Sequence, residues 1–187
     1  MGMPAIPNAV TSIEELLALP EDGMRHELLD GVHVVTPSPT YGHQSLLSTL
    51  FTHLLRATEN HNFCQVLTSP AEIVLGPRTL VQPDLFVIRI DPSHPPKDWR
   101  DVGVPVIAIE ILSPSTASRD RVAKRHIYQE VGIREYWIVD AKSRVIERWR
   151  TSDDRPEVCD ETLAWSIEDG PSAELSMVEL FGDQPTG

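Results

Sequence analysis

The chain has 187 residues, of which 41% are hydrophobic and 24% charged, and this composition is ordinary for a globular protein of one domain. No apolar run is long enough to span a bilayer, and the first residues lack the basic and apolar stretches of a secretory signal, so we expect no membrane contact. The formal net charge of −12 argues against a surface that binds phosphates through a general excess of lysine and arginine.

The two cysteines, Cys64 and Cys159, are far apart and form no CxxC pair, which disfavours zinc knuckles and redox motifs. Isolated thiols are typical of a reducing compartment, so we predict a cytoplasmic protein. We also predict a flexible N-terminal arm, residues 1–11, followed by a single domain, residues 12–187.

The first part of the domain predicts a short helix, a hairpin and a long helix. A capping box at Ser12 opens a helix that ends near Leu19. An Asp-Gly pair between two extended runs predicts a hairpin over residues 25–35. From 43 to 59 the apolar residues recur with the period of a helix packed on a sheet. Strands are then expected at 63–68, 71–75 and 83–88, and a surface loop at 91–104.

The strongest predicted strand is 105–112, because its nearly continuous aliphatic run is typical of a central strand covered on both faces. A helix over 119–131 and a strand over 135–140 follow, and a strand–helix–strand unit of this kind usually forms a right-handed parallel crossover. A further strand is expected at 145–150, and the remainder predicts two strands and a last turn near 179–181. Together these elements indicate an α/β fold in which helices flank a mixed central sheet.

Glu110 is the most informative residue, since it lies inside the aliphatic run VIAIEIL. A lone carboxylate in such a strand costs several kcal/mol unless it is paired, protonated or bound to a metal. Ala108 shares its face and leaves room beside the carboxylate. A buried ion pair with an arginine is the alternative to a metal-binding or catalytic role.

Asp84 begins another predicted strand after Pro83, and a Pro-Asp pair alone indicates little. Two carboxylates on neighbouring strands, however, can share one hard cation, and Mg²⁺ typically takes one or two carboxylates together with waters. Asp84 and Glu110 are therefore candidate metal ligands.

The predicted helix after the Glu110 strand carries Asp120, Lys124 and Tyr128 at spacing i, i+4, i+8, which aligns them on one face. A lysine there can bring its ammonium to a reacting phosphate or position a metal-bound water. A surface ion pair between Asp120 and Lys124 is the structural alternative. Glu27 in the hairpin and His43 at the start of the long helix are weaker candidates, because such residues are more often structural.

Several segments, in this order, resemble the Uma-two family of restriction endonucleases, which belongs to the PD-(D/E)xK nuclease superfamily. They are HELLDGVHVV, PSPTYGH, QPDLFVI, IEILSPST and RDRVAKRHIYQEVGIREYWIVD, and the resemblance covers roughly residues 12–150. It implies a restriction-endonuclease-like fold and cleavage of nucleic-acid phosphodiesters, with DNA the expected substrate and Mg²⁺ or Mn²⁺ the expected cofactor.

Carried over residue by residue, the resemblance makes Asp84 and Glu110 the metal-binding carboxylates and the backbone carbonyl of Ile111 a further ligand. The usual lysine of the superfamily, two residues after the glutamate, is absent because Leu112 stands there, and Lys124 is its expected substitute. The resemblance further implies that Glu27 holds a water of the metal shell. The residues expected to support the site are His43, Gln82, Asp120 and Tyr128.

The sequence thus predicts a metal-dependent endonuclease in which Asp84 and Glu110 bind the metal and Lys124 stabilises charge or orients water. Two alternatives stay open. The acidic charge and Leu112 favour a catalytically degenerate, dimeric interaction module, and the charge balance also allows a metal-dependent hydrolase of a smaller phosphate ester. Short aliphatic strands at a sheet edge are compatible with a homodimer.

Overall fold

The computed structural model describes residues 10–114 and 116–182, so most of the predicted arm lies outside the described residues. The helices are α1 (Ile13–Leu17), α2 (Tyr41–Thr58), α3 (Ala117–Arg119), α4 (Arg125–Glu130) and α5 (Met177–Phe181), and a π-helical turn, η1 (Asp120–Lys124), joins α3 to α4. The strands are β1 (Arg25–Leu29), β2 (Val32–Thr36), β3 (Cys64–Thr68), β4 (Ile73–Gly76), β5 (Thr79–Val81), β6 (Leu85–Arg89), β7 (Ile107–Ile111), β8 (Glu135–Asp140), β9 (Val145–Arg150), β10 (Glu157–Cys159), β11 (Thr162–Ser166) and β12 (Ser172–Ser176).

A six-stranded sheet of order β10-β9-β8-β7-β6-β3 forms the centre of the molecule. Strands β7 and β8 are parallel and are joined by α3, η1 and α4, whereas the other neighbours in this sheet are antiparallel. All five residues of β7 are buried, as expected of a strand covered on both faces. The predicted mixed sheet flanked by helices is confirmed.

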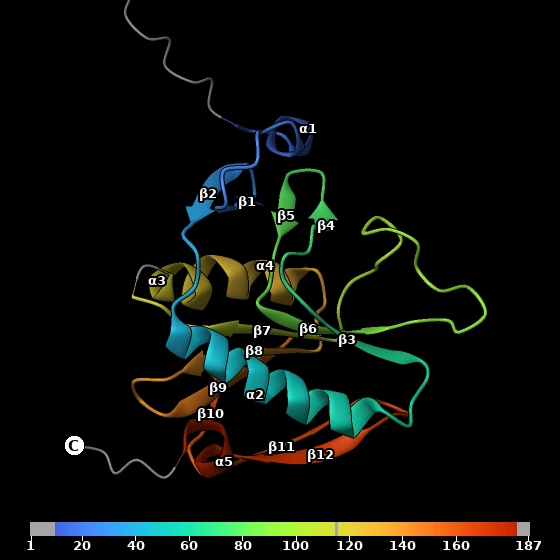
Figure 1. Cartoon of the computed structure of the whole chain (residues 1–187), viewed down its shortest axis with the longest axis vertical. Coiled ribbons are helices and arrows are strands. Elements are labelled where there is room, and N and C mark those ends of the chain that lie inside the picture. The colour runs from blue at the N-terminus through green and yellow to red at the C-terminus, as the bar shows by residue number, and fades with distance from the viewer. Residues whose placement is uncertain (1–9, 115, 183–187) are drawn as a thin grey trace, which may run out of the picture.

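The central sheet is covered on both faces (Figure 1). On one face Ile109 of β7 shares an apolar core with Leu54 of α2, and this core also includes residues of β11, β12 and α5. On the other face Ala108 shares a second core with Tyr128 of α4 and with the small antiparallel sheet β2-β1-β5-β4. Because side chains alternate along a strand, Glu110 points with Ala108 toward α4 and the small sheet.

Some predicted elements differ in detail from the structure. The strand expected at 71–75 is followed by a hairpin turn, so the chain returns at once in β5, which is too short to give a periodic signal. After residue 150 there are three strands and the helix α5 in place of two strands and a turn. Val10, which the sequence assigns to the N-terminal arm, packs against the small apolar core beside α1.

None of the described helices is long and apolar enough to cross a membrane.

The helix expected over 119–131 begins at Ala117 and contains the π-helical turn η1. A π-helical turn has more backbone per turn than an α-helix, and such turns occur frequently at functional sites. Asp120 and Lys124, which bound this turn, are both buried. The helix ends where Gly132 adopts a φ of +83°, a conformation that glycine accepts without strain.

Candidate active site

Asp84 and Glu110 come together because β6 and β7 pair in an antiparallel register. Leu85 lies opposite Ile109, and continuing this register places Asp84 opposite Glu110, on the same face of the sheet. The backbone N–H of Ile111 donates a 2.8 Å hydrogen bond to Oδ2 of Asp84. Both carboxyl side chains are buried, with 3% and 1% of their residues' surface exposed. The structure therefore brings together the two residues that the sequence singles out as metal ligands.

Lys124 lies between two carboxylates at the base of this face. Its Nζ is 2.6 Å from Oε1 of Glu110 and 2.7 Å from Oε1 of Glu27, and all three side chains are essentially inaccessible to solvent. The Tyr128 hydroxyl donates to the same Glu110 oxygen at 3.2 Å. Among the described residues, the cation that forms an ion pair with Glu110 is thus a lysine and not an arginine. The alternative of a surface ion pair is wrong, because Asp120 is as buried as Lys124.

The remaining predicted residues surround this group. Gln82 donates its backbone N–H to Oε1 of Glu27 at 2.7 Å, and its side-chain amide donates to the carbonyl of His26. The carbonyl of Asp120 accepts a hydrogen bond from the Tyr136 hydroxyl. Glu27 is therefore fixed by the strand segment that leads into Asp84, rather than standing alone on its hairpin.

Asp84 has two further partners. Arg25 Nη1 is 2.6 Å from Oδ1 of Asp84, and His43 Nε2 is 3.0 Å from Oδ2. His43 stands in the first turn of α2, whose N-terminus is capped by the Thr40 side chain. The Nδ1 atom of His43 is buried and has no hydrogen-bond partner within the described part of the chain. In this arrangement the imidazole orients Asp84 and does not offer its second nitrogen to a substrate.

Sequence reasoning missed Arg25. A signal was present, since Arg25 stands two residues before Glu27 on a predicted strand, and residues at this spacing share one face. Its significance depends on the pairing of β1 with β5, which places the small sheet over the end of β6. No periodic pattern within the hairpin predicts that long-range contact.

Burial and neighbouring charges shift the pKa values of Asp84 and Glu110 in opposite directions. Burial alone raises the pKa of Asp84, but the hydrogen bond from His43 and the charge of Arg25 outweigh it and bring the pKa to about 2. Burial raises the pKa of Glu110 to about 8, against the attraction of Lys124 and with the added repulsion of Asp84. Burial disfavours the charged form of Lys124, but Glu110 and Glu27 raise its pKa above the ordinary value. Near neutral pH Asp84 is ionised while Glu110 keeps its proton, a division of roles that is typical of catalytic acid pairs.

Glu110→Gln is expected to flatten the dependence of stability on pH. The folded protein keeps the Glu110 proton up to a pKa of about 8, whereas the unfolded chain loses it near 4.5, so this group makes the free energy of unfolding fall as pH rises through that window. Urea unfolding from about pH 5 to pH 8 should show a fall that is smaller in the variant by on the order of a few kcal/mol. Glu161→Gln, at an exposed position, is the control, and parallel curves for wild type and Glu110→Gln would contradict the assignment.

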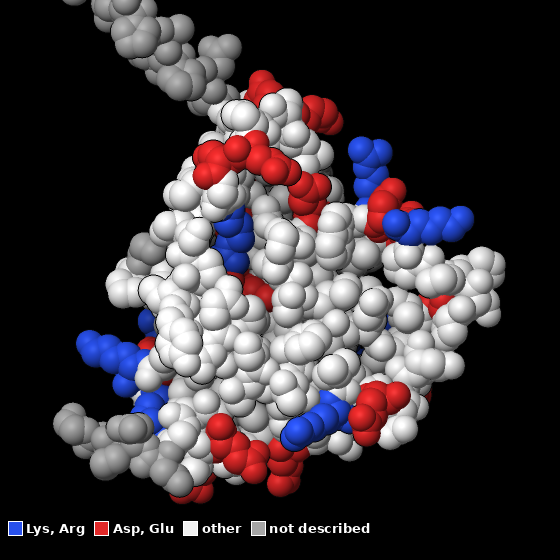
Figure 2. Space-filling view, viewed as in Figure 1, with Lys and Arg blue, Asp and Glu red and all other residues white. Residues whose placement is uncertain are grey.

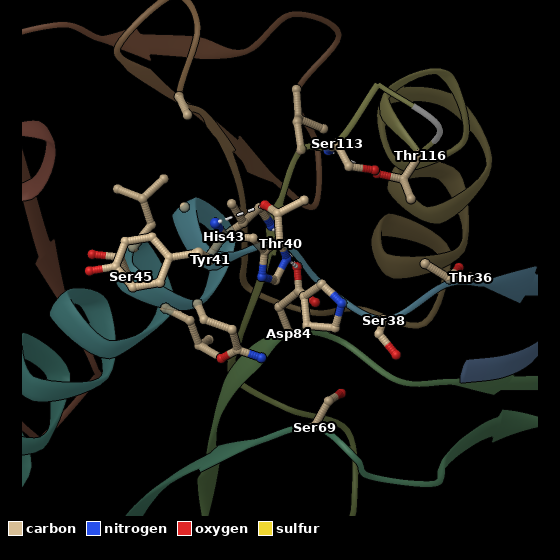
Figure 3. Close-up of a pocket in the computed structure, with 18 of the residues that line it drawn as sticks. Thr36, Ser38, Thr40, Tyr41, His43, Ser45, Ser69, Asp84, Ser113 and Thr116 are labelled. Atoms are coloured by element: carbon tan, nitrogen blue, oxygen red, sulfur yellow. Dashed lines mark hydrogen bonds and ion pairs between the residues drawn. The ribbon is translucent and has the colours of Figure 1, made fainter. Parts of the chain in front are cut away.

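A cavity of about 890 Å³ opens in front of Asp84. Arg25, His43, Asp84 and Ile111 line it, whereas Glu110, Lys124 and Glu27 lie behind this wall. Much of the remaining wall is hydroxylic, and Figure 3 shows these side chains around Asp84 and His43. They are Thr36, Ser38, Thr40, Tyr41, Ser45, Ser69, Ser113 and Thr116.

The charge of the cavity differs from that of the whole chain. Arg25, Arg144 and His43 line the cavity, and Asp84 is the acidic side chain among its lining residues. Figure 2 shows acidic groups gathered over the end of the molecule that carries α1, and a basic and an acidic group inside the hollow between the β1–β2 hairpin and α2. Local potential, more than net charge, decides whether an anionic substrate is attracted, so the charge of −12 does not exclude one here.

The side chains present suit a magnesium site that a substrate or waters complete. Among the described residues no group of three or more His, Cys, Asp or Glu is arranged to hold a metal ion by itself. Mg²⁺ in enzymes is usually held by one or two carboxylates, with waters and substrate oxygens as the other ligands. Asp84 and Glu110 provide such a pair, and Oε2 of Glu27 is a buried oxygen without a hydrogen-bond partner in the described residues.

The fold matches that of a solved structure. The chain resembles a crystal structure from Anabaena variabilis described as "a putative nuclease belonging to DUF820", with a TM-score of 0.74 and 20% sequence identity over 91% of this chain and 97% of that one. At this identity the likeness shows a shared fold. The chain is also 28% identical over 157 residues to an uncharacterized protein of Synechocystis sp. strain PCC 6803, which covers 81% of this chain and 80% of that protein.

The family follows from the match to a family model. The Uma2 model, described as "Putative restriction endonuclease", matches residues 13–177, which is most of the chain. The chain therefore belongs to this family, as the motifs in its sequence predict.

Proposed function

We propose that this protein is a metal-dependent endonuclease whose metal ligands are Asp84, Glu110 and the backbone carbonyl of Ile111. The observation that carries the proposal is that Asp84 and Glu110 meet on one face of the sheet, beside a buried lysine and at the wall of a hydroxyl-lined cavity. A bound Mg²⁺ or Mn²⁺ supplies a water of lowered pKa and stabilises negative charge on a phosphate. Membership of a nuclease family and the shared fold support this proposal.

In this proposal the residues have separate tasks. Asp84, ionised near neutral pH, attracts the cation, and His43 with the Ile111 N–H holds its carboxylate in place. Lys124 is fully buried behind Glu110, so we assign it to positioning Glu110 rather than to direct contact with the phosphate. Glu27 binds the same ammonium and holds it in contact with Glu110.

The substrate side of the cavity suits a polynucleotide strand. A second cavity of about 940 Å³ runs along α2 to Arg56 and shares Tyr41, Gln44 and Ser45 with the first. Tyr41, at the shared rim, is 90% exposed. Aromatic faces of this kind stack on nucleobases without regard to sequence. We propose that the strand leaves the catalytic cavity across Tyr41 and continues along α2.

The test is cleavage by the purified protein of labelled single- and double-stranded DNA and RNA, with Mg²⁺, with Mn²⁺ and with EDTA. We expect cleavage with either metal and none with EDTA. Calorimetry with Mn²⁺ on the same preparation separates the alternatives. Metal binding with cleavage of bis(p-nitrophenyl) phosphate but of no nucleic acid would favour a hydrolase of small phosphate esters.

Absence of Mn²⁺ binding would favour a non-catalytic interaction module, the second candidate. Leu112, which stands where the superfamily has its lysine, is the observation in favour of that candidate. The exposed valines Val32 and Val35 on the edge strand β2 are compatible with the homodimer that such a module would form. The cytoplasmic location and the homodimer stay predictions from the sequence.

A further inference from the structure

Among the described residues, Arg25 is the donor to Oδ1 of Asp84, on the side of the carboxylate that His43 and the Ile111 N–H leave open. The carboxylate has about four acceptor positions. Both positions on Oδ2 are used, by His43 and by the Ile111 N–H, and Oδ1 is bound by Arg25 at 2.6 Å. The Arg25 guanidinium also donates to the carbonyl of Gln82 at 3.2 Å, so two oxygen acceptors orient it.

Arg25 lies among three acidic side chains, which is an environment that stabilises a positive charge. Burial disfavours its charge, but Glu110, Asp84 and Glu27 together raise its pKa above the ordinary value. Lys124 is the other cation of the cluster and is already shared by Glu27 and Glu110. The charge of Asp84 therefore depends on Arg25 and the His43 imidazole.

Resting on the proposed function, we infer that Arg25 and a divalent metal ion compete for the Oδ1 side of Asp84, so that metal binding displaces the guanidinium. A metal ion binds a carboxylate oxygen at about 2.1 Å, nearer than the guanidinium, and a guanidinium left in its present place would face it as a like charge. Arginine cannot relieve this repulsion by losing its proton, because its pKa is above about 12. It has to move.

The cavity provides space into which the Arg25 side chain can move. Its side chain is 20% exposed and lines the cavity in front of Asp84, unlike Lys124, which is enclosed. A guanidinium turned outward from Asp84 lies where the proposed substrate phosphate enters, and its planar fork suits two phosphate oxygens. Arg25 would thus hold Asp84 when no metal is bound and bind substrate when one is.

The test compares the affinity for Mn²⁺ of wild type, Arg25→Gln and Arg134→Gln by calorimetry with MnCl₂ alone. Arg134 forms an exposed ion pair with Glu168 and is the matched control. We expect Arg25→Gln to bind Mn²⁺ about tenfold more tightly or better, which is the scale on which groups around metal ligands change affinity. Arg134→Gln should match wild type.

Thermal unfolding with and without MnCl₂ is a second measurement, which also tests the inference if Arg25→Gln is less stable than wild type. In EDTA, Arg25→Gln should have a lower Tm than wild type, since Asp84 loses its main countercharge, and MnCl₂ should raise its Tm by more than that of wild type. Arg25→Lys keeps the charge and should stay near wild type in both measurements.

The outcomes separate this inference from the proposed function. If Asp84→Asn abolishes Mn²⁺ binding while Arg25→Gln binds as wild type does, or more weakly, competition is refuted and the metal site stands. If neither wild type nor any Arg25 variant binds Mn²⁺, the metal site and the competition fall together. Tighter binding by Arg25→Gln alone supports both.

Discussion

Asp84→Asn is expected to reduce metal-dependent cleavage of nucleic acid by about three orders of magnitude or more. A bound metal stabilises a phosphoryl transition state by several kcal/mol, and each 1.4 kcal/mol or so is a factor of ten in rate. Asparagine keeps the size of Asp84 and an oxygen that can accept the Ile111 N–H, but it loses the charge that attracts the cation. Cleavage of the best substrate from the panel, at saturating Mg²⁺, measures the loss.

Asp91→Asn is the matched control for Asp84→Asn. Asp91 follows β6 into an exposed loop, where its partner is His94, so its replacement changes the net charge equally without touching the site. Both variants, purified like the wild type, also control for a contaminating nuclease. Retention of wild-type cleavage by a folded Asp84→Asn would remove Asp84 from the chemistry and with it the metal site.

The centre of the site could be predicted because a carboxylate in an aliphatic strand is a local anomaly. Glu110 stands among residues that must be buried whatever the rest of the fold, so its need for a partner follows from the strand alone. The π-helical turn could not be predicted in this way, because the spacing of Asp120, Lys124 and Tyr128 fits an ordinary α-helix equally well. All three are buried as the spacing predicts.

The surroundings of Asp84 could not be predicted in the same way. Arg25 reaches Asp84 from β1, and His43 reaches it from α2, on the opposite face of the central sheet from α4. These contacts depend on how separate elements pack, and sequence periodicity describes each element only by itself. The family resemblance implied that His43 lies near the site, whereas Arg25 was indicated only by its two-residue spacing from Glu27.

Lys124→Met is expected to lower the free energy of unfolding by about 3–5 kcal/mol, which is the usual effect of breaking a buried ion pair by removing one partner. Methionine fills a similar volume but leaves the Glu27 carboxylate without its countercharge and the Glu110 carboxyl without the ammonium that donates to it. Urea unfolding at neutral pH measures the loss, and Lys142→Met, at an exposed position, is the control.

The same argument predicts a partial rescue. Adding Glu27→Gln and Glu110→Gln to Lys124→Met removes the two carboxyl groups that have lost the ammonium, and replacing all members of a buried ionic group is far less destabilising than removing one. The triple variant should therefore be more stable than Lys124→Met while remaining inactive, because it lacks the Glu110 ligand. If instead Lys124→Met unfolds like the Lys142→Met control, the ammonium does not hold the two carboxylates, and the assignment of Lys124 to positioning Glu110 is lost.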